Sequence, residues 1–255
     1  MLLQTKTPAG YESVGSYVGI YFEGAVLIIM AILLIDLYRI YRVSKVKMTF
    51  DLLIGFLFYW IAVFFSWIAK WYLWQHSESA LEGPLWLQLI YKFKFTMALC
   101  VLGNYYISMF FKTIFSKSGM RPDRNYITVI RKIVFITVIL VSHIPAYLTR
   151  SAEIAYITDA IGFLIMLIDM TFLIPNGIKS FKSSRVMDFG KKYFYIGLTA
   201  FLEFNMAIMF LLDRITMVLG IPGPFGELGY TGFYFAAWGT VIVGIVFAIY
   251  GFVRR

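Results

Sequence analysis

Long runs of hydrophobic residues, separated by short polar stretches, dominate the sequence. A helix needs about 20 largely apolar residues to cross the hydrocarbon core of a bilayer. Seven runs have about that length or more, and each predicts a transmembrane helix. Their expected ranges are 17–41, 50–74, 85–115, 126–148, 154–176, 192–219 and 230–253. We therefore expect an all-α membrane protein that forms a single seven-helix transmembrane domain over residues 1–255.

The loops between these segments fall into two classes by charge. The first, third and fifth loops and the C-terminus are rich in Lys and Arg, whereas the other loops hold few basic residues. The basic positions of the odd-numbered loops include Arg39, Arg42, Lys45, Lys47, Lys112, Lys117, Arg121, Arg124, Lys179, Lys182 and Arg185. Because basic loops are retained in the cytoplasm, we expect a cytoplasmic C-terminus and an external N-terminus, in the plasma membrane.

Composition and charge narrow the possible partners. Hydrophobic residues make up 60% of the chain and charged residues 15%, against about half and one quarter in soluble domains. The net charge of +9 follows the orientation signal of the loops, so we expect the lipid bilayer and not nucleic acid as the partner. With Cys100 as the one cysteine and with two histidines, His76 and His143, we expect neither an intramolecular disulfide nor a metal site.

Ionisable residues in the outer halves of the predicted helices are candidates for ligand binding, because such residues are costly in a bilayer. Glu23 and Asp159 lie at similar outer depths in the first and fifth segments, and Lys92 and Lys94 lie in the third. The two lysines point to different faces of a helix, so one can enter the bundle while the other extends to the headgroups. Glu23 or Asp159 can neutralise an inward lysine, which forms either a ligand pocket or a structural ion pair.

The deepest polar positions form a second candidate group. Asp169 lies in the fifth segment, and Glu203 lies near the bilayer centre in the sixth. A carboxyl group in its neutral form donates a hydrogen bond, which can reach Asn104 or Asn205 on a neighbouring helix. The same group can relay a proton. Both a structural hydrogen bond and a role in transport remain open at these positions.

Several activities are not expected. The middle of the last segment, residues 235–243, contains no lysine, so a retinal Schiff base is not predicted there. We expect no cofactor. The third segment ends Phe110-Phe111-Lys112 and not with the Asp-Arg-Tyr sequence of G-protein-coupled receptors. The motifs of zinc proteases and of serine hydrolases do not occur, so we do not expect an enzyme.

The sequence combines three general features: aromatic helices, the basic loop 39–47, and tight polar outer turns such as residues 75–79. In these features it resembles the seven-transmembrane N-terminal region of prokaryotic, especially archaeal, sensor histidine kinases. The resemblance implies that the protein senses an external or membrane-borne signal. Because the sequence ends at Arg255 without a kinase, we expect a stand-alone sensor with a separate cytoplasmic signalling partner or a homo-oligomeric form.

Three functions are therefore considered. The leading hypothesis is a receptor-like sensor that binds a small ligand among the outer halves of the first, third and fifth helices. The second is a small-solute or proton-coupled transporter that uses Asp169 and Glu203; a weak similarity between residues 28–36 and 164–169 suggests the internal duplication that such proteins can have. The third is an accessory subunit of a membrane complex, since 25 Phe and 12 Met residues suit adaptable helix packing.

Overall fold

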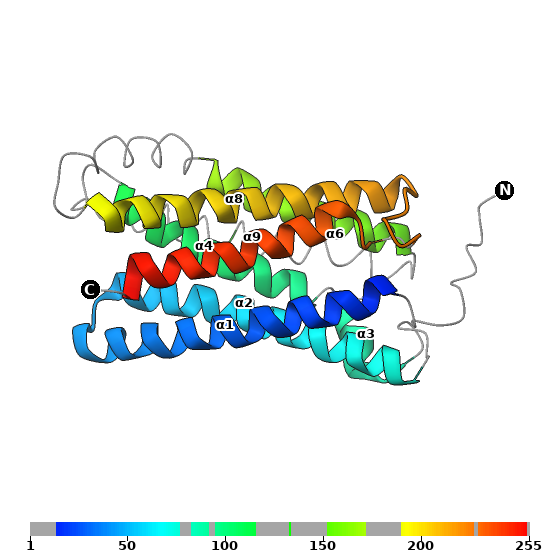
Figure 1. The fold of residues 1–255 in the computed structure, drawn as a ribbon, viewed down its shortest axis with the longest axis horizontal. Coiled ribbons are helices and arrows are strands. Elements are labelled where there is room, and N and C mark those ends of the chain that lie inside the picture. Colours follow the sequence, from blue (N-terminus) through cyan, green and yellow to red (C-terminus); the bar gives the residue numbers. More distant parts are fainter. Residues whose placement is uncertain are drawn as a thin grey trace.

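The chain folds as a set of long helices that lie side by side (Figure 1). The computed structural model describes residues 14–76, 83–91, 95–115, 133, 152–171, 190–226 and 229–253. The helices are α1 (Val14–Ser44), α2 (Lys47–His76), α3 (Leu85–Tyr91), α4 (Phe95–Phe115), α6 (Ala152–Met170), α8 (Gly190–Val218) and α9 (Gly232–Ala248), which continues into a π-helix (Ile249–Val253). Within these ranges all regular structure is helical, with no strand.

Six of the seven expected segments coincide with described helices. The expected segment 85–115 contains α3 and α4, and residues 92–94 between them lie outside the described residues. The expected segment 126–148 also lies outside them, apart from residue 133. Four described helical stretches are long and apolar enough to cross a membrane: Tyr17–Ser44, Lys47–His76, Phe194–Val218 and Gly232–Phe252. The count of seven crossings is thus an inference from the sequence.

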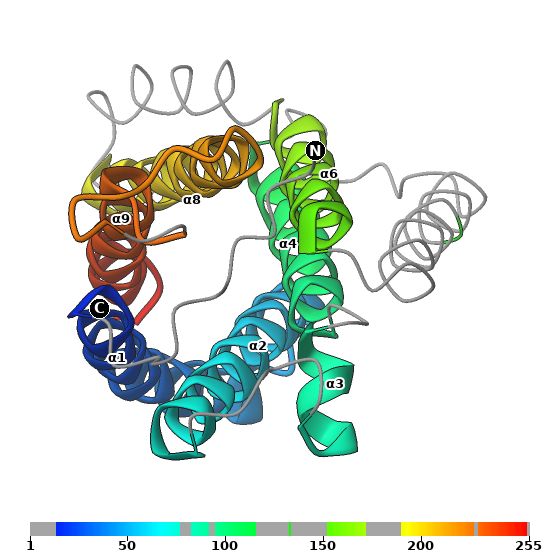
Figure 2. The same cartoon turned by 90° about the vertical axis from the view of Figure 1, so that its right-hand side faces the viewer.

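The helices α1, α2, α4, α6, α8 and α9 form a closed ring. Each packs against the next in chain order, and α9 returns to pack against α1. Figure 2 shows this ring along its axis, with α3 outside it beside α2. Leu87 and Ile90 of α3 pack there against Ala69 and Leu73 of α2. The ring order places α2 opposite α8, with two helices between them on either side.

Indole side chains fix the register of α1 against α2. Trp60 Nε1 donates to the carbonyl oxygen of Leu27, and Trp67 Nε1 donates to that of Ile20, each at 3.1 Å. The two contacts are two helical turns apart on both helices, as expected for an antiparallel pair. This register brings the C-terminal part of α2 next to Glu23 on α1.

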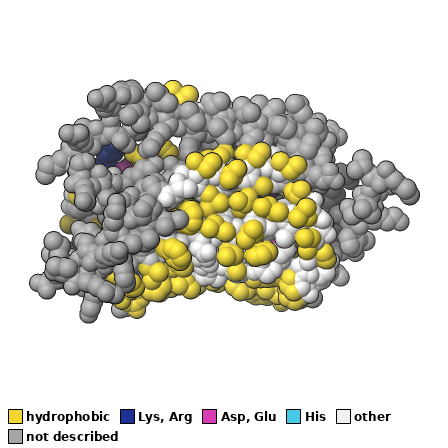
Figure 3. All heavy atoms as spheres, turned by 90° about the horizontal axis from the view of Figure 1, so that it is seen from above, with side chains coloured by type: hydrophobic (Ala, Val, Ile, Leu, Met, Phe, Trp, Pro, Cys, Tyr) yellow, Lys and Arg dark blue, Asp and Glu magenta, His cyan; other side chains and the backbone are white. Residues whose placement is uncertain are grey.

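The outer surface of the ring is apolar. On α1, Ile28, Ile32 and Ile35 are between 50% and 68% exposed, and Figure 3 shows hydrophobic side chains spread over one broad face of the molecule. Exposed apolar surface of this extent is unusual for a soluble monomer, and it is what contact with lipid acyl chains requires. The apolar helices are therefore consistent with contact with a lipid bilayer.

Candidate functional site

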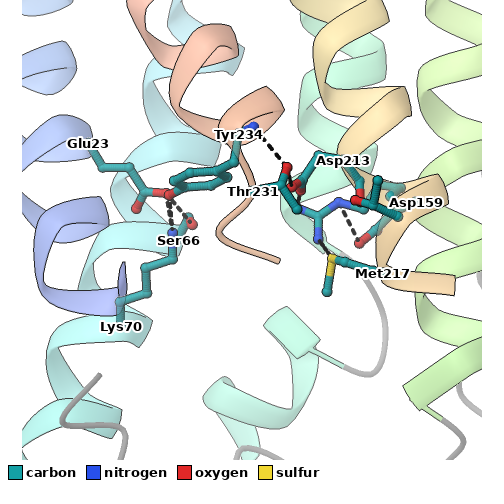
Figure 4. Close-up of polar contacts among 10 residues, drawn as sticks. Glu23, Ser66, Lys70, Asp159, Asp213, Met217, Thr231 and Tyr234 are labelled. Carbon is teal, nitrogen blue, oxygen red and sulfur yellow. Dashed lines mark hydrogen bonds and ion pairs between the residues drawn. The ribbon is translucent and has the colours of Figure 1, made fainter. Parts of the chain in front are cut away.

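A buried ion pair joins α1 to α2. Glu23 on α1 is 1% exposed, and Lys70 on α2 binds its Oε1 atom. Ser66 Oγ, one turn from Lys70, also donates to Glu23 Oε1, at 3.4 Å. On α9, Tyr234 Oη accepts from Lys70 Nζ at 2.8 Å and donates to Glu23 Oε1 at 3.2 Å (Figure 4). These four residues, which we call the Glu23 cluster, hold three helices together.

The Glu23 cluster lies on the inner side of the ring. The helices α2 and α9 are the two neighbours of α1 in the ring. The hydrogen bond between Lys70 and Tyr234 therefore joins these two helices on the interior side of α1. The Lys70 ammonium group lies 5.2 Å from the ring centroid of Tyr234 and 5.7 Å from that of Tyr230, within the range of cation–π attraction. Among the described residues, the second carboxylate oxygen of Glu23, Oε2, has no hydrogen-bond partner.

A second group of charges joins α6 to α8. Arg214 Nε lies 3.9 Å from Asp159 Oδ2, and Arg214 Nη2 lies 3.9 Å from Asp213 Oδ2. These separations are ion pairs but are too long for hydrogen bonds. Arg214 Nη1 donates to Met217 Sδ at 2.8 Å, while Arg214 Nε has no hydrogen-bond partner among the described residues. The guanidinium group therefore keeps hydrogen-bonding capacity that the described residues do not use.

The first turn of α9 connects the two groups. Thr231 caps α9: its Oγ1 atom donates to Asp213 Oδ1 at 2.6 Å and accepts from the backbone N–H of Tyr234 at 3.4 Å. We call Asp159, Asp213, Arg214, Met217 and Thr231 the Arg214 cluster. The loop before α9 passes close to this turn, since a Cβ atom on Gly223 would lie 2.0 Å from the carbonyl oxygen of Tyr230. Figure 4 shows Tyr234 of the Glu23 cluster next to Thr231 of the Arg214 cluster.

A hydrogen bond crosses the interior of the ring at a position further along the ring axis than the Glu23 cluster. Tyr59 Oη on α2 donates to Glu203 Oε1 on α8 at 2.8 Å, and Glu203 is 8% exposed. Because α2 and α8 are opposite each other in the ring, this bond spans its interior. Tyr59 lies two helical turns from Ser66 along α2, so the bond is on the order of 10 Å further along the ring than the Glu23 cluster. We call this pair the central bridge.

A cavity of about 40 Å³ adjoins the central bridge. Its wall comes from α1, α2, α8 and α9, and consists of Met30, Phe56, Tyr59, Thr199, Leu202, Glu203, Met206, Thr240, Val241, Gly244 and Ile245. Most of these side chains are apolar, and the oxygen atoms belong to Tyr59, Thr199, Glu203 and Thr240. A cavity of this size can hold one to a few water-sized molecules, but not a larger organic ligand.

The two candidate asparagines lie between neighbouring helices. Asn104 on α4 is fully buried, and its Nδ2 atom donates to the carbonyl oxygen of Met166 on α6 at 3.5 Å. Asn205 Nδ2 on α8 donates to Thr240 Oγ1 on α9 at 3.4 Å. Among the described residues Glu203 is hydrogen-bonded to Tyr59 and not to either asparagine, and its carboxyl group is the acceptor.

The sequence predicts Glu23 and Asp159 as site residues, but it does not predict the cations that pair with them among the described residues. Those cations are Lys70 and Arg214. Lys70 stands among tryptophans at the end of α2, where such residues usually mark the membrane interface. A signal was present, since Ser66 and Lys70 are four residues apart and share one helix face.

Three other candidate positions lie outside the described residues: Lys92, Lys94 and the side chain of Asp169. Within the described ranges, no group of three His, Cys, Asp or Glu side chains is placed to hold a metal ion. Comparisons of the chain with protein-family models, with curated proteins and with solved structures found no match.

Proposed function

We propose that the chain is a multi-pass plasma-membrane protein with seven spanning helices and an external N-terminus. Four described helices of sufficient length and hydropathy support the membrane assignment, and α4 and α6 contribute shorter apolar stretches to the same ring. The orientation rests on the basic loops, such as the one around Lys45. In this orientation the start of α9 and both charge clusters lie in the outer half of the membrane.

The function that we propose is that of a receptor-like sensor for a small charged or polar solute. Buried charges must be paired to be tolerated, and both clusters contain charged groups with unused hydrogen-bonding atoms: Glu23 Oε2, Asp213 Oδ2 and Arg214 Nε. A solute that reaches the outer half of the ring can bind these atoms. Such binding acts as a signal when it favours one packing of the helices over another.

The first turn of α9 carries the proposal. Thr231 is bound to one cluster and Tyr234 to the other, so a solute that rearranges either cluster also moves this turn. A helix is stiff along its axis, and α9 runs from there to the π-helix at the opposite end of the ring. At that end Phe252 contacts Phe110 of α4. A displacement of α9 would therefore alter the cytoplasmic surface.

Replacement of Tyr234 by Phe tests this coupling. Pools of amino acids, organic acids and amines are first screened for solutes that raise the melting temperature of the protein in nanodiscs. Spin labels at positions 47 and 250, in a Cys100→Ser background, then report the distance between the cytoplasmic ends of α2 and α9. We expect a stabilising solute to shift this distance in the wild type. In the Tyr234→Phe variant we expect about tenfold weaker binding and a smaller shift, because both hydrogen bonds of the Tyr234 hydroxyl are lost.

Tyr38→Phe is the matched control, because Tyr38 is an exposed tyrosine on α1 and its hydroxyl belongs to neither cluster. It should bind and respond like the wild type. The sensor proposal is wrong if a solute that stabilises the protein leaves the label distance unchanged, or if that solute is carried across the membrane.

Glu203 supports a second candidate function, a small-solute or proton-coupled transporter. Its carboxyl group lies inside the ring, next to a cavity and far from both ends of α8. A protonatable group at the centre of a membrane bundle is a common element of coupled transport. The central bridge would then separate an outer from an inner access path.

Flux measurements distinguish this candidate from the sensor. The protein is reconstituted into vesicles, and proton or solute uptake is compared between the wild type and Glu203→Gln. A transporter requires uptake by the wild type and a loss of at least tenfold in the variant, whereas a sensor gives the background rate for both. Asp36→Asn is a suitable control, because Asp36 pairs with an exposed arginine at the end of α1.

A further inference from the structure

The loop between α8 and α9 presents apolar side chains at its surface. Residues 215–226 include no charged residue, and Thr216 is the one residue among them with a polar side chain. In the loop, Leu219, Ile221 and Phe225 are 66%, 48% and 44% exposed. A group of exposed apolar side chains marks a surface that contacts a partner or a membrane.

The start of this loop has a defined backbone. The N–H group of Gly220 donates to the carbonyl of Met217 at 3.1 Å, and that of Ile221 donates to the carbonyl of Thr216 at 2.9 Å. These are the two hydrogen bonds of a Schellman C-cap, which requires the positive φ that Gly220 adopts, 69°. The residue after the glycine usually packs against the helix in this motif, whereas Ile221 is half exposed here. An ordered turn therefore holds Ile221 at the surface.

The loop is also fixed against α9. The close approach of Gly223 to the carbonyl of Tyr230 joins its backbone to the residue just before the first turn of α9. The Phe225 ring lies 5.9 Å from the ring of Phe235 on α9, edge to face, and Phe235 lies 5.9 Å from Phe22 on α1. The loop thus lies where α9 meets α1.

Aromatic residues show the level of this loop along the ring. A Cβ atom on Gly19 would lie 3.0 Å from Cε1 of Tyr230, so the loop leads into α9 at the level of the exposed Tyr17 and Tyr21 on α1. The Tyr17 ring lies 6.1 Å from that of Trp74, near the end of α2. Tyr and Trp favour the headgroup region of a bilayer. Figure 1 shows the loop, in orange, at the end of the ring where α1 begins.

The length of α9 gives the same level. Its apolar stretch, Gly232–Phe252, has 21 residues and extends about 30 Å, which is the thickness of the hydrocarbon core. A loop that directly precedes this stretch begins at the boundary between the acyl chains and the headgroups.

We propose that residues 219–226 insert their apolar side chains into the lipid leaflet at this end of the ring, so that the partner of the loop is the bilayer surface. Because the loop holds no charge, apolar burial drives the insertion and anionic lipids are not required. The contacts with Tyr230 and Phe235 let the inserted loop hold the start of α9 at a fixed depth. The proposal needs the protein to lie in a membrane, but it depends on neither the orientation nor the binding of a solute.

Spin labels measure the depth of the loop. Cysteine replaces Ile221 or Phe225 one at a time, in a Cys100→Ser background, and the labelled protein is placed in phosphatidylcholine nanodiscs. Power saturation compares the access of oxygen, which dissolves in lipid, with that of a neutral nickel chelate, which dissolves in water. We expect both labels to lie about 5–10 Å below the lipid phosphates, the depth typical of interfacial apolar side chains.

Gln75 is the matched control position, because it is an exposed polar residue next to Trp74 and so lies at the same end of the ring. A label there should lie at the phosphates or in water. With the label at position 221, Phe225→Asp should reduce the depth to that of the control, and Phe225→Leu should leave it unchanged.

Three results would overturn the proposal. Labels at 221 and 225 that the nickel chelate reaches as readily as the label at 75 would place the loop in water. Labels that neither reagent reaches would show that protein, such as a second copy of the chain, covers the loop. A depth that Phe225→Asp does not alter would show that the apolar side chain does not drive insertion. None of these results bears on the solute-dependent signal proposed above.

Discussion

Lys70→Met should destabilise the protein by about 3–5 kcal/mol, because it leaves Glu23 buried without its cationic partner. Glu23 is 1% exposed, and its remaining hydrogen-bond donors are Ser66 and Tyr234. Methionine matches the length and apolar stem of lysine, so the change removes the charge with little change in packing. The free energy of unfolding is measured by titration of the protein in mixed micelles with a denaturing detergent.

The double variant Glu23→Gln/Lys70→Met separates loss of charge pairing from loss of packing. With both charges removed, most of the lost stability should return, since a buried ion pair can often be replaced by neutral groups at little cost. Lys47→Met is the control, because Lys47 is exposed at the start of α2. If Lys70→Met and the double variant were equally unstable, the ion pair would have no part in the stability of the ring.

The positions of the helices along the chain could be predicted, because length and hydropathy set them directly. α1, α2, α8 and the helix formed by α9 with its π-helical end begin and end within three residues of the expected ranges. The run 85–115 is apolar on both sides of its two lysines, and hydropathy alone does not indicate that α3 packs on α2 outside the ring.

The partners within the site could be predicted much less well. A sequence gives the depth of each residue from its distance to the helix end, and this placed Glu23 and Asp159 at similar levels. It does not give the rotation of each helix or its neighbours. The central bridge shows the consequence, since Tyr59 and Glu203 are 144 positions apart in sequence. They meet because the ring places α2 and α8 opposite each other, so that the two side chains reach one another across the interior. No local sequence pattern specifies this order of helices.

The ring order also explains why charges from distant segments share one interior. The first three ring helices are α1, α2 and α4, and the last three are α6, α8 and α9. Each helix of the first set lies opposite the helix of the same rank in the second set. Glu23 and Asp159, on α1 and α6, therefore approach the interior from opposite sides. The first turn of α9 completes the connection between their clusters.

The helices α2 and α4 approach each other closely at two glycines, Gly55 and Gly103. A Cβ atom on Gly103 would lie 2.8 Å from the carbonyl oxygen of Gly55 and 2.9 Å from Cδ1 of Tyr59. The first of these atoms is backbone and cannot move without moving α2. Small residues at helix crossings in membranes permit this close approach of backbones.

Gly103→Ala should therefore separate α2 from α4 and destabilise the protein by about 1–3 kcal/mol, the usual cost of overpacking. Gly239→Ala is the matched control on α9, where a Cβ atom would meet nothing within 4 Å. There alanine should stabilise the helix by roughly 0.5–1 kcal/mol, because glycine is the poorer helix former. Both are measured by the same detergent titration. Equal stabilities of the two variants would contradict the close crossing. Because Tyr59 belongs to both this contact and the central bridge, Gly103→Ala should also disturb the hydrogen bond between Tyr59 and Glu203.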